Sequence, residues 1–284
     1  MSKLQYKFGT FDFCYPFPGP PAIRLAGEAG FDGICIGDLY GCEKNYPLNQ
    51  KCIQQQYLEA SRKYNVSLEV FQLFSMSNLR GRYDHFDPDS REAEKGRTAV
   101  RRAAEACEAM GIPRIMIGTT VIRDANERNN IKENFKEYVK ICAQHGVRLT
   151  IENDMTVEQL IPFLDEVGHG LKACFDTNNP IFYGTGYSPD MIRALGKDRI
   201  DHFHMKESRA NEFGVLTRKE ELVTVLGEGD SHFAEAVDAI HDIGFQGWIF
   251  AETFYFFKGF QGRDYVEIGK HTLRNLRRAY LDAQ

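Results

Sequence analysis

The residues best suited to chemistry in this sequence are histidines and acids that end short apolar segments. His202 and His204 lie two residues apart between apolar residues, and positions i and i+2 of a strand face the same side. Three other apolar segments close on an acid, at Glu152, Asp176 and Glu252. We predict that these four strand ends meet.

Three carboxylates and an imidazole at one place favour a bound divalent cation. Without a cation the carboxylates would repel one another, and at least one pKa would rise strongly. Oxygen ligands with one imidazole and no thiolate are typical of Mn²⁺, Mg²⁺ or Co²⁺ rather than of a structural zinc site, and we expect Mn²⁺. The predicted ligands are Glu152, Asp176, His204 and Glu252.

Junctions that end on glycine reveal the elements that must position these residues. In each junction a helical pattern closes on glycine, an apolar residue follows, and a β-rich run begins, as at residues 29–34, 110–115, 145–149 and 243–248. Glycine readily adopts the left-handed conformation that ends a helix. From these junctions we predict eight strands, near residues 6–13, 33–38, 67–74, 114–119, 148–152, 171–176, 200–206 and 247–252.

Helical periodicity is clearest between these strands, at Thr98–Met110, Ile131–Cys142 and about Tyr265–Leu281. Strict alternation of helices with near-continuous apolar strands indicates an α/β protein with a parallel sheet. Eight such units in 284 residues favour a closed (β/α)8 TIM barrel, with its active site at the C-terminal ends of the strands. No composition break marks a second domain, so we expect residues 1–284 to form one domain.

Long connections follow four of the predicted strands, at residues 75–89, 177–187, 207–231 and 253–262. Long connections are usually functional, and these lie on the side of the barrel that carries the chemistry. They are rich in aromatic residues, with the densest run at Phe254–Phe257. These rings would form lids and an oligomer interface, or would hold a substrate with an apolar or aromatic part. Arg80, Arg82 and Arg209 would be solvated or would bind a phosphate or carboxylate.

Composition excludes several other classes. The formal charge of −5, with no long basic run, argues against nucleic acid as a partner. There is no apolar signal region and no stretch of about 18 uncharged apolar residues, so we expect a cytoplasmic protein without a membrane partner.

The seven cysteines are an odd set without a CxxC pair, which excludes a disulfide framework and a zinc knuckle. Cys174 shares a strand face with Asp176 and could lie beneath the site, although buried thiols more often only fill space.

Seven short motifs extend the pattern over the chain: Gly30-Phe31-Asp32-Gly33, Asp87-Pro88-Asp89, Ile151-Glu152-Asn153, Phe175-Asp176-Thr177, His204-Met205-Lys206-Glu207, Leu226-Gly227-Glu228-Gly229-Asp230 and Glu252-Thr253-Phe254. With them the sequence resembles the xylose isomerase-like barrel superfamily, also called sugar phosphate isomerase/epimerase or AP endonuclease family 2. The resemblance is to its ketose 3-epimerases and inosose dehydratases in particular. It implies that the four strand-end residues are metal ligands.

The resemblance also implies a reaction, in which the metal holds a carbonyl and an adjacent hydroxyl oxygen of a carbohydrate. One of Glu152 and Glu252 would remove a proton from carbon, and the other would return or donate one. Candidate substrate contacts are Glu158, Asn179, His202, Lys206, Arg209 and Phe254. His202 could instead support the site from behind, and Lys206 could pair with Glu207 or Asp176.

Two departures and two alternatives stand beside this interpretation. Asp38 lies three residues beyond the position where relatives often carry an acid, and Asn179 replaces a frequent histidine, which counts against the multi-zinc endonuclease branch.

A lyase could use the same proton abstraction to expel a β-substituent, as in inosose or dehydroshikimate dehydration or cleavage of oxidised C-glycosides. A metabolite-binding scaffold would not need this ligand set. We expect an enzyme that is a homo-oligomer.

Overall fold

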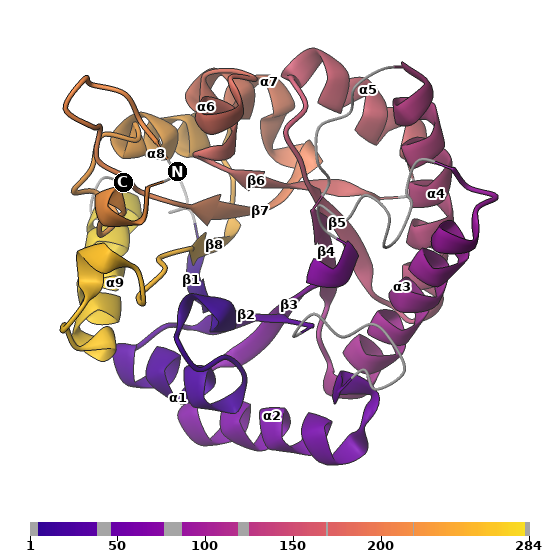
Figure 1. Cartoon of the computed structure of the whole chain (residues 1–284), viewed down its shortest axis with the longest axis horizontal. Coiled ribbons are helices and arrows are strands. Elements are labelled where there is room, and N and C mark those ends of the chain that lie inside the picture. Colours follow the sequence, from indigo (N-terminus) through magenta and orange to yellow (C-terminus); the bar gives the residue numbers. More distant parts are fainter. Residues whose placement is uncertain are drawn as a thin grey trace.

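The computed structural model describes residues 5–38, 47–76, 87–118, 125–168, 170–217 and 219–281. Over these ranges parallel strands pair in chain order into a closed barrel of eight, which confirms the predicted (β/α)8 fold (Figure 1). The strands are β1 (Tyr6–Phe11), β2 (Gly33–Gly37), β3 (Ser67–Gln72), β4 (Arg114–Gly118), β5 (Arg148–Glu152), β6 (Lys172–Asp176), β7 (Ile200–Met205) and β8 (Gly247–Ala251). The assignment of residues 1–284 to one domain stays a prediction.

Helices surround the strands as an outer ring (Figure 1). The α-helices are α1 (Pro20–Ala29), α2 (Lys51–Tyr64), α3 (Arg91–Met110), α4 (Ala125–Gln144), α5 (Val157–Val167), α6 (Asn179–Tyr183), α7 (Ser188–Arg199), α8 (Phe233–Asp242) and α9 (Tyr265–Leu281). Short 3₁₀ turns are η1 (Asp12–Cys14), η2 (Pro47–Asn49), η3 (Phe74–Met76), η4 (Glu220–Leu222) and η5 (Lys258–Phe260).

The junctions that the glycines predicted are present. Gly30 and Gly111 end α1 and α3 with φ angles of 94° and 69°, and their N–H groups donate to carbonyls of the last helical turn. Such positive φ values are costly for residues with a side chain. Gly146 and Gly244 adopt the same left-handed conformation before β5 and β8.

Some elements differ from their predicted bounds because buried polar contacts override the apolar pattern. β1 ends at Phe11, two residues early, where the buried Asp12 carboxylate accepts hydrogen bonds from the Gly19 and Gly37 N–H groups at 3.1 and 3.0 Å. β3 ends at Gln72. Helix α3 begins at Arg91, seven residues before the predicted start, because the Ser90 hydroxyl caps it.

Rings on β8 fill one side of the barrel core and require small residues opposite. Trp248 and Phe250 stack with ring centroids 5.4 Å apart. A Cβ atom at Gly33 would lie 2.6 Å from the Trp248 ring, and one at Gly9 would lie 2.4 Å from Phe250. Both approaches are too close for a side chain, so glycine on β1 and β2 allows β8 to close the barrel.

Asp201 joins three strands at the end of the barrel where the strands begin. Its side chain is 1% exposed. Its carboxylate accepts hydrogen bonds from Arg114 Nε at 2.5 Å and from Arg148, and Arg114 also pairs with Glu69 at 3.0 Å. Burial alone would raise the pKa of Asp201, but the hydrogen bond to His202 and the two guanidinium groups hold it well below its usual range. One carboxylate therefore connects β4, β5 and β7.

We expect Asp201→Asn to lower the free energy of unfolding by about 3 kcal/mol, because it removes the buried negative charge that Arg114 and Arg148 share and leaves Arg114 paired with Glu69 alone. The measurement is urea-induced unfolding followed by circular dichroism. Asp165→Asn is the matched control, because Asp165 pairs with Arg199 at the surface, and its loss should cost less than about 1 kcal/mol. Equal losses in the two variants would contradict the proposed role of Asp201.

Candidate metal centre

Glu152, Asp176, His204 and Glu252 meet where strands β5 to β8 end. Each offers a ligand atom, and these four atoms all lie within 4.8 Å of one another. Asp176 and His204 are register partners across β6 and β7, and the N–H of Glu252 donates to the Met205 carbonyl at 2.9 Å. Consecutive strands of a closed barrel thus place these four side chains on one arc.

Lys206 lies among the carboxylates. Its Nζ is 2.7 Å from Asp176 Oδ2, 3.0 Å from Glu252 Oε1 and 4.0 Å from Glu152 Oε1. Burial alone would lower the pKa of Lys206, but the surrounding carboxylates, Asp176 first, raise it well above its usual value. Three ionised carboxylates against one ammonium leave two negative charges, which is the charge that one divalent cation neutralises.

Asn179 and the backbone at the start of α6 hold two of these carboxylates in place. Asp176 Oδ1 accepts hydrogen bonds from the N–H groups of Asn178 and Asn179 at 2.8 and 2.9 Å. Asn179 Nδ2 donates to Glu152 Oε1 at 2.7 Å. Burial raises the pKa of Glu152, whereas for Asp176 the effect of burial is outweighed by Lys206 and His204, and its pKa is lowered.

His204 is buried, and neither of its ring nitrogens makes a hydrogen bond within the described part of the chain. Nδ1 lies 3.4 Å from Glu252 Oε2 and 3.9 Å from Glu152 Oε2. Burial lowers the pKa of His204 to about 4, so the imidazole is neutral at pH 7 and keeps a lone pair. Buried polar groups without partners are rare, and a neutral imidazole facing carboxylates fits a metal ligand.

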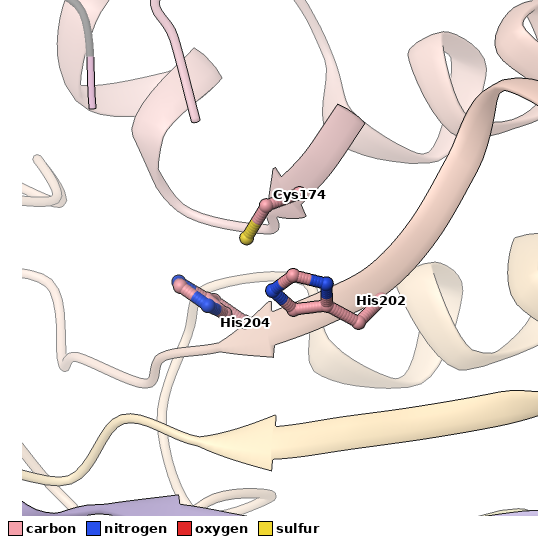
Figure 2. A group of neighbouring side chains, drawn as sticks. All are labelled: Cys174, His202 and His204. Carbon is pink, nitrogen blue, oxygen red and sulfur yellow. The ribbon is translucent and has the colours of Figure 1, made fainter. Parts of the chain in front are cut away.

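Cys174 on β6 and His202 on β7 lie beside His204 (Figure 2). They are register partners, two residues before Asp176 and His204 on the same strands. His202 therefore lies beneath the four-residue cluster and does not belong to it.

A cavity of about 330 Å³ adjoins the cluster, and its lining includes Glu252 of the cluster and the neighbouring Lys206. Its walls come from α6 and from the segments that follow β7 and β8. Phe254 and Phe257 stack at 4.8 Å with an angle of 12° between their rings. The lining residues are Phe182, Lys206, Glu207, Ser208, Val223, Glu252, Phe254 and Phe257.

The segment after β7 is held in place by Glu207. Its buried carboxylate accepts hydrogen bonds from the N–H groups of Ser231 and Gly227 at 2.8 and 3.2 Å. A Cβ at Gly229 would lie 2.6 Å from the Ser208 carbonyl oxygen, so glycine is needed there. These contacts hold the wall residue Ser208, which forms an antiparallel bridge with the wall residue Val223. No periodic pattern in the sequence signalled either residue.

Other predicted site residues lie elsewhere. Glu158 is exposed in the first turn of α5, and Arg209 is exposed after β7; neither lines the cavity nor belongs to the four-residue cluster. Asp38 is buried and accepts a hydrogen bond from the Ser75 N–H at 3.0 Å, which indicates a structural role. Arg80 and Arg82 lie outside the described residues.

Aromatic residues near the C-terminal ends of the strands lie in different environments. Phe182, Phe254 and Phe257 line the cavity. Phe11, Tyr15 and Phe71 are fully buried and form part of the core instead. In the described ranges, no helix is both long and apolar enough to span a membrane.

Similarity to known proteins is clearest in the overall fold. A D-psicose 3-epimerase from Clostridium cellulolyticum H10, in a structure with D-tagatose, superposes with a TM-score of 0.77 at 16% identity, covering 96% of this chain and 99% of that one. The IolI protein, in a structure with a zinc atom, gives a TM-score of 0.73 at 16% identity, covering 97% and 99%. Identities this low support the fold alone.

Sequence comparison adds one curated relative and a family. An inosose dehydratase of Yersinia enterocolitica is 27% identical over 143 residues, which are 45% of this chain and 48% of that protein, so the match spans about half of the relative. The family model described as xylose isomerase-like TIM barrel matches residues 23–276. Because that match covers most of the sequence, the chain belongs to the xylose isomerase-like TIM barrel family.

Proposed function

We propose that this protein is a divalent-cation-dependent isomerase or epimerase of a sugar or sugar derivative. The observation that supports this most is the convergence of three carboxylates on a buried imidazole without hydrogen bonds, beside a cavity. Glu152, Asp176, His204 and Glu252 would hold the cation, and Mn²⁺ suits this oxygen-rich set best. The epimerase with D-tagatose shows that a relative of this fold binds a ketose.

Each polar residue has a role in this proposal. A bound cation would polarise the substrate carbonyl and offset negative charge that develops on its oxygens. One of Glu152 and Glu252 removes a proton from the neighbouring carbon and keeps it, and the other, in its protonated form, donates a different proton. Lys206 holds a substrate oxygen, and Asn179 orients Glu152 through the 2.7 Å hydrogen bond. Glu158, His202 and Arg209 stay proposed as substrate contacts.

A lyase is the second candidate, favoured by the similarity to an inosose dehydratase. The same carboxylates would remove the proton next to the carbonyl. The reaction would then expel a group from the β-carbon instead of adding a proton at the other face. The two outcomes need the same first step and differ in the fate of the leaving group, so product analysis separates them.

The shape of the cavity favours a substrate with two unlike ends. Lys206 and Glu252 form a charged end, whereas Phe182, Phe254 and Phe257 form apolar walls. A volume of about 330 Å³ is at the lower end of small-molecule sites, which span about 300–1,000 Å³. We propose that the sugar part lies at the charged end and that an apolar or aromatic part of the substrate contacts the rings.

The expected homo-oligomer and cytoplasmic location stay proposals.

Divalent cations should stabilise the chelator-treated protein. At a Mn²⁺ concentration 100 times Kd, we expect the free energy of unfolding to rise by about 2.7 kcal/mol. Asp176→Asn should abolish most of this rise because it removes a charged ligand, whereas the exposed Glu158→Gln should retain it. Urea unfolding with and without Mn²⁺ and titration calorimetry measure the effect. The metal centre would be refuted by an equal rise in Asp176→Asn and the wild type.

Glu152→Gln and Glu252→Gln should each lower turnover by about 10²–10⁴-fold, the contribution of a positioned acid or base. The assay is a screen of keto sugars, inososes and 3-keto-glycosides with Mn²⁺ in heavy water, read by mass spectrometry. Deuterium gained without loss of a group indicates an isomerase or epimerase; release of water or a phenol indicates a lyase. The control is Glu166→Gln, which changes an exposed carboxylate that pairs with Lys132 and belongs neither to the cluster nor to the cavity lining, and which should leave turnover unchanged.

Phe257→Ala should weaken binding of ligands that carry an aromatic group. For a phenyl and a methyl 3-keto-glycoside, we expect the preference for the phenyl compound to fall by up to about tenfold, since an aromatic contact contributes about 0.5–1.5 kcal/mol. Phe213→Ala, at an exposed ring that does not line the cavity, is the control. An equal loss for both glycosides would indicate that the Phe257 ring only shapes the cavity.

A further inference from the structure

A second group of ligand-type side chains lies one layer below the carboxylates. Cys174 Sγ and one nitrogen each of His202 and His204 all lie within 4.8 Å of one another. Figure 2 shows the thiol and the two rings turned toward a common space. Cys174 and His202 are register partners, and so are Asp176 and His204, so the two groups occupy successive levels of the same pair of strands.

His202 is oriented like a metal ligand. Its Nδ1 lies 3.2 Å from Asp201 Oδ1, and its Nε2 is buried and has no hydrogen-bond partner within the described ranges. A carboxylate that accepts from one ring nitrogen fixes the tautomer and leaves the lone pair on the other, as is usual for histidines that bind metals. Asp201 is itself held by Arg114 and Arg148.

The surroundings offer these nitrogens little else to bind. The Phe11 ring meets His204 edge-on at 4.6 Å, and Phe250 meets His202 at 5.6 Å. Cys174, His202 and His204 are all buried, at 2%, 0% and 0% exposure. Aromatic walls do not accept or donate conventional hydrogen bonds, so the neighbours of His202 Nε2 that could share a cation are the thiol and His204. His204 also faces the carboxylates, with its Nδ1 3.4 Å from Glu252 Oε2.

We propose that Cys174, His202 and His204 form a second cation position, which takes Zn²⁺ or another thiophilic divalent cation. Thiolate and imidazole are preferred zinc ligands, and a fourth position would be left open. Binding converts the thiol to a thiolate: the S–H bond breaks, a sulfur–metal bond forms and one proton leaves to solvent. In a tetrahedral zinc site the ligand atoms lie about 3.3–3.8 Å from one another. The three atoms are separated by up to 4.8 Å here, so small side-chain rotations must bring them closer when zinc binds.

His204 makes the two positions alternatives. It belongs both to the carboxylate group and to the thiol group. A neutral imidazole has one lone pair, so His204 can serve one cation at a time. A hard cation such as Mn²⁺ is drawn to the carboxylates, whereas a thiophilic cation is drawn to Cys174 and removes His204 from the upper site. This inference rests on the lower group and does not require the proposed reaction.

Zinc K-edge X-ray absorption tests the lower position directly. Chelator-treated protein with one equivalent of Zn²⁺ should show one sulfur neighbour at about 2.3 Å together with nitrogen neighbours at about 2.0–2.1 Å. Cys174→Ser should lose the sulfur neighbour and at least tenfold in zinc affinity. Cys107→Ser, which changes a fully buried thiol on α3, should keep the sulfur neighbour and the zinc affinity of the wild type.

Two spectroscopic outcomes would overturn the inference. A wild-type first shell of oxygen and nitrogen alone would place zinc elsewhere, and a sulfur neighbour that persists in Cys174→Ser would assign it to another thiol. A second measurement on the wild type covers the case in which Cys174→Ser does not fold. Under mild denaturation Zn²⁺ should slow the alkylation of Cys174, read by mass spectrometry, more than that of Cys107, because a sulfur–metal bond adds to the stabilisation that both buried thiols gain. Equal slowing of the two thiols would also contradict the inference.

Discussion

Repulsion among buried like charges is the constraint on which this site depends. The closed barrel forces Glu152, Asp176 and Glu252 into one small space, where each ionised carboxylate raises the energy of the others. Lys206 offsets one of the three charges, at 2.7 Å from Asp176. The remaining negative charge favours a bound cation, so the proposed metal centre would relieve a repulsion that the fold itself creates.

The rest of the barrel supports that concentration of charge. Small residues at Gly9 and Gly33 let the rings of β8 fill the interior, and β8 leads directly to Glu252. At the other end, Asp201 ties β7 to β4 and β5 through two arginines and also contacts His202. Strand β7 therefore connects a charged network at the bottom of the barrel with the proposed metal centre at the top.

Much of the fold was predictable because its signals are local. Near-continuous apolar strands, helical periodicity and junction glycines such as Gly30 and Gly111 each act within a few residues. Strand ends were less accurate, since the end of β1 is set by Asp12, which hydrogen-bonds to residues 7 and 25 positions further along the chain. Contacts at that separation leave no local pattern. For the same reason the wall residues Ser208 and Val223 had no signal in the sequence.

The sequence by itself determined which residue types end the strands, because strand parity and the acid or histidine at each end can be read from one short segment at a time. It therefore indicated the group Glu152, Asp176, His204 and Glu252. Only the tertiary structure decided how these segments contact one another. It shows that Lys206 pairs with Glu252, that Asn179 donates a hydrogen bond to Glu152, that a cavity adjoins Glu252, and that Cys174 and His202 are register partners. Those relations depend on strand register and barrel closure, which bring together residues far apart in the chain and are not encoded by any one segment.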